Sequence, residues 1–161
     1  MRFVWKGLAT GVAALTLSAA AGGPHGHDDH APTAATPTSL PTVTVFKTPT
    51  CGCCKGWAEH VEKHGFKVVA RDLADVTPIK TAHGVPEALR TCHTALVGGY
   101  VIEGHVPADL IAKLLKERPK VAGLAVAGMP MGSPGMEGPT SERYDVVTFT
   151  KAGKTAVYAK R

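Results

Sequence analysis

Three cysteines within four residues, Cys51-Gly52-Cys53-Cys54, constrain this chain more than any other feature. They follow a β-branched and aromatic run at 42–46, which predicts a strand. The segment that they open, 53–64, has apolar residues at helical spacing and stops at a glycine. Thiols at a helix N-terminus meet unpaired amides and the positive end of the dipole, which favour thiolate. The sequence therefore predicts a thiolate-rich site between a first strand and a first helix.

The remaining pattern predicts alternating strands and helices. Strands are expected at 42–46, 66–73, 94–97, 100–103, 144–150 and 155–158. Helices are expected at 53–64, 78–83, 86–90 and 108–117. The order β-α-β-α-β-β-α, with cysteines after the first strand, indicates an α/β domain of thioredoxin-like type. The last two strands are expected to form a hairpin added at the edge of its sheet.

The first 41 residues indicate export rather than a folded core. Residues 1–21 combine a basic start, a short apolar stretch and small residues, which is typical of a secretory signal peptide cleaved near Ala20 or Ala21. The alternative, an uncleaved anchor, is disfavoured because the apolar stretch is short for a membrane span. Residues 22–41 are rich in Gly, Pro, Ala, Thr and His and predict a disordered linker. Its His25, His27 and His30 form either a metal-collecting tail or a plain tether.

The composition predicts one globular domain, expected at 42–161. With the signal peptide removed, the mature protein is expected in the periplasm, without stable membrane insertion. Apolar residues make up 44% of the chain and charged residues 19%. The net charge of +5 falls when Arg2 and Lys6 leave with the signal peptide, and what remains is spread without a basic run. Nucleic-acid binding is therefore not expected.

Four cysteines in an exported chain raise the alternative of two structural disulfides. The spacing argues against it, because adjacent Cys53 and Cys54 point apart and three sulfurs in four residues close almost no loop. A Cys51–Cys54 bridge would leave Cys53 to pair with Cys92. Cys92 directly precedes the predicted strand 94–97, and in a thioredoxin-like fold that loop lies beside the first helix. The four sulfurs are therefore expected to converge.

Clustered thiolates select Cu(I), zinc or iron–sulfur clusters. Structural zinc usually draws its ligands from two separated pairs, and iron–sulfur assembly is not expected outside the cytosol. Copper is the favoured metal, because Cu(I) accepts two or three thiolates and bridging sulfurs let several ions share few residues.

Other side chains could add to such a site. Three methionines in a Gly/Pro-rich segment offer soft thioethers or merely cover apolar surface; they are Met129, Met131 and Met136. His93 is the best histidine candidate, as an occasional ligand or as a partner of one. His105 could lie near the site or in a turn. His60 and His64, one helical turn apart, could form a ligand pair, but a solvated helix face is the favoured interpretation.

Several motifs together resemble one bacterial family. They are the segments 51–57, 84–86, 92–95 and 97–108. They resemble the DUF411 family, which includes the CopG-type copper-resistance proteins, over roughly residues 42–151. The resemblance implies a thioredoxin-like fold, an exported location, and copper held by the CxCC cysteines with the later cysteine. It also implies redox cycling of the bound copper between Cu(I) and Cu(II).

The leading hypothesis is a periplasmic copper-binding protein in copper resistance or homeostasis. Cu(I) would be held by Cys51, Cys53, Cys54 and Cys92, as a single ion or a thiolate-bridged multinuclear cluster. Its partners would be copper ions and other periplasmic copper-handling proteins, and the choice between carrier and copper oxidoreductase stays open. The alternative is a thiol–disulfide oxidoreductase in which Cys51 attacks and Cys54 resolves. The third hypothesis is a non-catalytic domain with two disulfides.

Overall fold

The computed structural model describes residues 39–161. The expected signal peptide and the linker histidines lie outside the described residues. Helices span Gly52–Lys63 (α1), Thr77–Ala82 (α2) and Ala108–Glu117 (α3), with a 3₁₀ turn at Glu87–Leu89 (η1). Strands span Val43–Lys47 (β1), Val68–Asp72 (β2), Thr94–Val97 (β3), Tyr100–Glu103 (β4), Gly123–Ala125 (β5), Asp145–Phe149 (β6) and Thr155–Lys160 (β7). No helix among these residues is long and apolar enough to cross a membrane.

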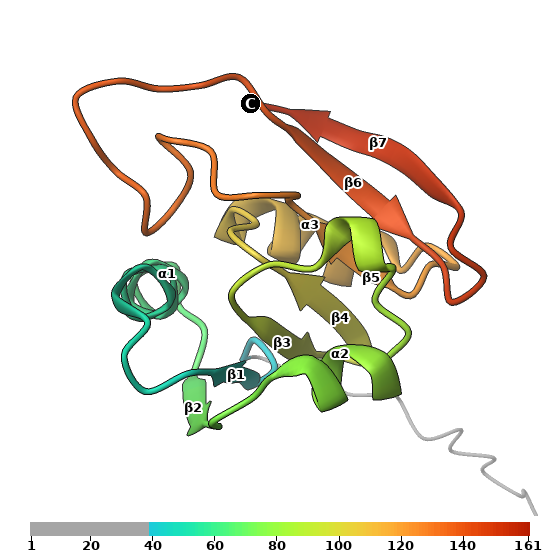
Figure 1. The fold of residues 1–161 in the computed structure, drawn as a ribbon. Coiled ribbons are helices and arrows are strands. Elements are labelled where there is room, and N and C mark those ends of the chain that lie inside the picture. Colours follow the sequence, from blue (N-terminus) through green and yellow to red (C-terminus); the bar gives the residue numbers. More distant parts are fainter. Residues whose placement is uncertain (1–38) are drawn as a thin grey trace, which may run out of the picture. The chain divides into compact units, whose positions relative to one another are not determined.

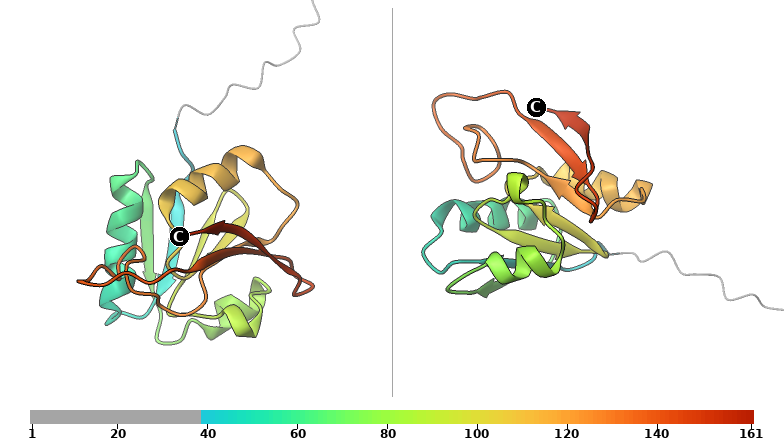
Figure 2. Two further views of the ribbon diagram at one scale, coloured as in Figure 1. Left: turned by 90° about the horizontal axis from the view of Figure 1, so that it is seen from above. Right: turned by 45° about the vertical axis from the view of Figure 1, so that its right-hand side comes forward.

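The strands form one mixed sheet in the order β2-β1-β3-β4-β5-β6-β7 (Figure 1). β1 runs parallel to β2 and antiparallel to β3, and β4 runs antiparallel to β3 and parallel to β5. The C-terminal hairpin β6–β7 continues the sheet at the end opposite β2, as the right-hand view of Figure 2 shows. The sequence pattern missed β5, through which this hairpin joins the rest of the sheet.

Two apolar clusters cover the two faces of the sheet. On one face α1 and α3 pack against alternate strand residues, with Trp57, Ile111 and Ile102 fully buried. On the other face Val101 and Phe149 pack with residues of the α2–η1 region. Val101 and Ile102 are neighbours in β4 and enter different clusters, as the period-2 alternation of a strand requires.

The sheet register explains why distant cysteines meet. β1 and β3 are antiparallel, and Phe46 near the end of β1 lies opposite Thr94 at the start of β3. The residues that follow β1 and those that precede β3 therefore leave the sheet at the same edge. Cys51 and Cys92 both lie in these flanking segments.

One histidine prediction on α1 is wrong. His60 does not lie on a solvated face: its Nε2 accepts a hydrogen bond from the backbone N–H of Ala108, the first residue of α3, at 3.2 Å. The N-cap of α3 is Pro107, whose side chain makes no capping hydrogen bond, so His60 supplies the missing acceptor from another helix. His64 is exposed as expected, and its Nδ1 lies 2.8 Å from the carbonyl of His60.

Candidate metal centre

The four cysteines converge at the N-terminus of α1. All four sulfur atoms lie within 4.8 Å of one another. Cys51 and Cys54 form a disulfide with their Cα atoms 5.3 Å apart, whereas Cys53 and Cys92 are free thiols. The Sγ of Cys53 lies 3.6 Å from that of Cys51 and 4.0 Å from that of Cys92. The sequence-based expectation that Cys92 meets the CxCC segment is confirmed.

The helix start itself holds the first sulfur in place. Cys51 is the N-cap of α1, and its Sγ accepts the backbone N–H of Cys54 at 3.3 Å. A sulfur thus takes the role that a Ser or Asp oxygen usually has at this position. Cys54 is fully buried and Cys53 is half-buried, so α1 directs its cysteines both into the core and toward Cys92.

Two buried histidines flank Cys92. The Nε2 of His105 lies 3.3 Å from the Sγ of Cys92, and its Nδ1 lies 2.7 Å from the carbonyl of Pro134. A carbonyl only accepts, so Nδ1 must carry the proton, and the lone pair of Nε2 faces the sulfur. This arrangement, with the distal nitrogen anchored to the backbone, is the one that metal-ligating histidines adopt. His105, which sequence reasoning left between site and turn, therefore belongs to the centre.

His93 packs against an aromatic ring as well as against Cys92. It is fully buried, its ring centroid lies 4.5 Å from that of Trp57, and its Nδ1 lies 3.5 Å from the Sγ of Cys92. Its Nε2 is buried and has no hydrogen-bond partner among residues 39–161. A buried polar atom without a partner costs about 1–3 kcal/mol, so a specific reason for the imidazole at this position is required. Contact with Cys92 supplies one.

Burial also sets the protonation of these groups. It raises the pKa of the Cys92 thiol to about 12, helped by the neighbouring Cys53. Burial lowers the pKa of His93 well below its ordinary value of 6.5, with further lowering by His105 and Lys80. The pKa of His105 is also lowered by burial. Without metal, the centre therefore holds a neutral thiol at Cys92 and neutral imidazoles beside it.

The neutral histidines predict a loss of stability in acid. Because their pKa values are lower in the folded state than the unfolded value of 6.5, the unfolded chain binds more protons as the pH falls through that value. We expect the unfolding free energy of the metal-free protein to decline from pH 7.5 to 5, by at most about 1.4 kcal/mol per pH unit for each such histidine. His93→Phe should flatten the slope in urea titrations. A wild-type stability that is constant over this range would contradict the prediction.

A buried ion pair supports the segment that carries Cys92. Lys80 is 3% exposed and Glu103 is fully buried, and the Nζ of Lys80 lies 2.6 Å from Oε1 of Glu103. The same oxygen accepts the backbone N–H of Thr91 at 2.6 Å, and Oε2 accepts the hydroxyl of Thr94 at 2.6 Å. Glu103 thus fixes the residues on both sides of Cys92 and His93. The sequence offered no sign of this network.

The loop between β5 and β6 closes over the centre. Figure 1 shows it reaching back to α1. Gly135 lies so close to α1 that a Cβ there would stand 2.5 Å from the Cys53 carbonyl and 2.6 Å from the Trp57 amide, and its φ is +82°. Only glycine combines this approach with this backbone conformation. Pro134, one residue earlier, is the buried residue whose carbonyl anchors His105.

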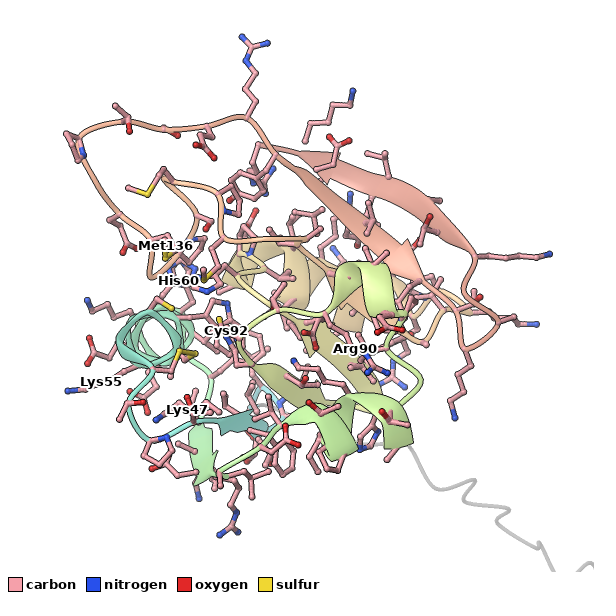
Figure 3. All side chains as sticks on the ribbon, in the orientation of Figure 1. Lys47, Lys55, His60, Arg90, Cys92 and Met136 are labelled. Carbon is pink, nitrogen blue, oxygen red and sulfur yellow. A yellow bond between two sulfur atoms is a disulfide. The ribbon has the colours of Figure 1, made fainter. Side chains whose placement is uncertain are left out.

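The three candidate methionines all lie in this loop. Met129 is 52% exposed, while Met131 and Met136 are half-buried. Figure 3 places Met136 beside α1, in the same region as His60 and Cys92. Met136 is therefore the best placed of the three, and Met129 is directed toward solvent.

The donor set fits a soft metal ion. Sulfur atoms and imidazole nitrogens gather at one place, and Cys92 with His93 and His105 forms a second group of ligand atoms within 4.8 Å. Soft thiolates and borderline imidazoles suit Cu(I) and zinc rather than magnesium or calcium. The Cys51–Cys54 disulfide removes two of these donors, so the number of thiolates available depends on the redox state.

Comparison with known proteins points to one family. A protein-family model described as "Protein of unknown function, DUF411" matches residues 89–136. Two solved structures entitled "Copper resistance protein copG", Form 1 and Form 2, are each 44% identical to this chain with a TM-score of 0.72. They cover 76% of this chain, and the match spans 98–99% of theirs. No curated protein matches. The protein therefore belongs to the DUF411 family and is similar over most of its described length to proteins named CopG.

Proposed function

We propose that this protein binds Cu(I) as its cargo or substrate, in the reduced state, through the thiolates of Cys51, Cys53, Cys54 and Cys92. The observation that carries the proposal is the approach of all four sulfur atoms to within 4.8 Å. Thiolates select Cu(I) over the harder ions, and sulfur atoms this close can bridge more than one ion. A multinuclear thiolate cluster is therefore the form that we expect.

Side chains around the sulfurs would complete the coordination. His105 offers an anchored Nε2, and His93 lies against Cys92 on the other side. Met136 and, with more movement, Met131 and Met129 offer thioethers, which remain ligands in an oxidising compartment because they form no disulfides. Bound copper that alternates between Cu(I) and Cu(II) would supply one-electron chemistry to this centre.

The similarity to CopG supports a role in copper resistance. The sheet order β2-β1-β3-β4, in which β3 alone runs opposite to the other three strands, supports a thioredoxin-like core to which β5–β7 are added. Export to the periplasm, with cleavage near Ala20 or Ala21, is proposed from the sequence of residues 1–21. Other periplasmic copper-handling proteins would be the donors or acceptors.

An anaerobic Cu(I) titration against a competing chelator tests the proposal on fully reduced protein. Cys92→Ala removes a sulfur that is distant in sequence but lies within the cluster. Loss of a residue that only supports a ligand typically lowers metal affinity about tenfold to a hundredfold. Because Cys92 would be a ligand itself, we expect its loss to weaken Cu(I) binding by at least this much. His64→Gln, which changes an exposed residue of α1, serves as the control. Equal binding by wild type and Cys92→Ala would refute the four-sulfur site.

The Cys51–Cys54 disulfide favours a second candidate, a thiol–disulfide oxidoreductase. Its two cysteines have the CxxC spacing at a helix N-terminus, where the attacking thiolate is stabilised. In that case Cys54→Ser should trap substrate proteins as mixed disulfides on Cys51. If copper binding is the function instead, the variant should trap none and should only weaken Cu(I) uptake.

A further inference from the structure

The two free thiols lie against the disulfide rather than apart from it. Cys53 lies between Cys51 and Cys92: its Sγ is 3.6 Å from that of Cys51 and 4.0 Å from that of Cys92. We propose that the disulfide moves by internal exchange from Cys51–Cys54 to Cys53–Cys92, so that Cys53 and Cys92 form a second redox pair. This activity goes beyond metal binding, because it requires no ion.

The exchange balances without any outside oxidant. The thiolate of Cys53 attacks the Sγ of Cys51, the Cys51–Cys54 bond breaks, and Cys54 leaves as a thiolate that takes up a proton. The thiol of Cys92 then loses its proton and attacks the Sγ of Cys53, and Cys51 leaves as a thiolate. One disulfide is consumed and one is formed. The two protons lost by Cys53 and Cys92 are balanced by those that the released thiolates gain.

The surroundings of the sulfurs favour this direction. The Sγ of Cys51 accepts the N–H of Cys54 at 3.3 Å and lies at the positive end of the α1 dipole. Both stabilise Cys51 as a thiolate, and so favour the reduced form of the Cys51/Cys54 pair. The Sγ of Cys92 instead lies against the imidazoles of His93 and His105, which are both buried, and away from the N-terminus of a helix. Its thiolate is therefore stabilised less than the thiolate of Cys51, so Cys92 is the better of the two to remain bonded in the disulfide. We therefore expect the disulfide to lie between Cys53 and Cys92 rather than between Cys51 and Cys54.

Trypsin separates the two disulfides cleanly. Cys51, Cys53 and Cys54 all lie in the peptide 48–55, whereas Cys92 lies in 91–113. A Cys51–Cys54 bond stays inside one peptide, and a Cys53–Cys92 bond joins two. Metal-free protein that carries one disulfide is incubated at pH 7.5, its free thiols are blocked with N-ethylmaleimide, and the digest is analysed by mass spectrometry. We expect the linked pair 48–55/91–113 in wild type and its loss in Cys53→Ser.

A second measurement counts the thiols. Diamide oxidation of wild type should give a monomer with two disulfides and no free thiol, whereas Cys53→Ser should keep Cys92 free. A wild-type digest without the linked peptides, or linked peptides that persist in Cys53→Ser, would overturn the proposal. So would two thiols that survive diamide. No metal enters these experiments, so their outcome is independent of the Cu(I) titration.

Discussion

Glu103→Ala should destabilise the metal-free protein by about 3–5 kcal/mol, the usual cost of breaking a buried ion pair on one side. The variant leaves the ammonium of Lys80 with 3% exposure and without its carboxylate. It also removes the acceptor for the Thr91 amide and the Thr94 hydroxyl. Urea unfolding followed by Trp57 fluorescence, with the disulfide state held constant, measures the loss.

A matched double variant separates the charge from the packing. Lys80→Met with Glu103→Gln removes both charges and keeps similar volumes, and the amide oxygen can still accept the Thr91 N–H. We expect it to recover most of the stability, whereas Glu103→Gln alone should lie between the two. The single Glu103→Ala change should also speed alkylation of Cys92, because Glu103 fixes Thr91 before it and Thr94 after it. A loss below about 1 kcal/mol would show that water reaches Lys80.

Most of the sheet could be predicted from the sequence because most of its strands, and the helices that cover it, have a recognisable local pattern of residues. The hairpin β3–β4 has its Gly98-Gly99 turn, and α3 has an apolar face and a proline after its end. The three-residue strand β5 is too short to show alternation. It exists because Gly123 lets the chain come close to Val101, where any Cβ would overlap the carbonyl oxygen. Such an approach is a property of the folded chain and leaves no periodic signal.

The four cysteines of the centre could be predicted from the sequence, but the residues that hold them in place could not. The CxCC spacing and the position of Cys92 before a strand carry chemistry that depends on few residues. His105 and Glu103 enter from a different segment, and their roles depend on partners that the sequence does not indicate. His105 is defined by the carbonyl of Pro134, 29 residues away, and Glu103 by Lys80, 23 residues away. The glycine between Glu103 and His105 is the local sign of a turn at this point, and Gly104 does adopt a φ of +71°.

Cu(I) should hold the protein in its reduced form. The four-thiolate site and the Cys51–Cys54 disulfide exclude each other, because the disulfide removes two of the four donors. Any ligand that binds one state only shifts the equilibrium toward it, by about 2.7 kcal/mol when its free concentration is one hundred times its Kd. For a two-electron couple this is a rise of about 60 mV in the reduction potential of the disulfide. Copper and the disulfide are therefore expected to be thermodynamically linked.

The linkage is measured by equilibrating the protein in glutathione buffers of defined potential, with free Cu(I) fixed by a competing chelator. The fraction of oxidised protein follows from thiol labelling and mass spectrometry. We expect the midpoint to move upward with free Cu(I) in wild type. Cys92→Ala binds Cu(I) more weakly but keeps the Cys51–Cys54 pair intact, so its midpoint should move less at the same free Cu(I). A wild-type midpoint that does not respond to Cu(I) would mean that the oxidised and reduced forms bind copper equally, and that Cys51 and Cys54 are not ligands.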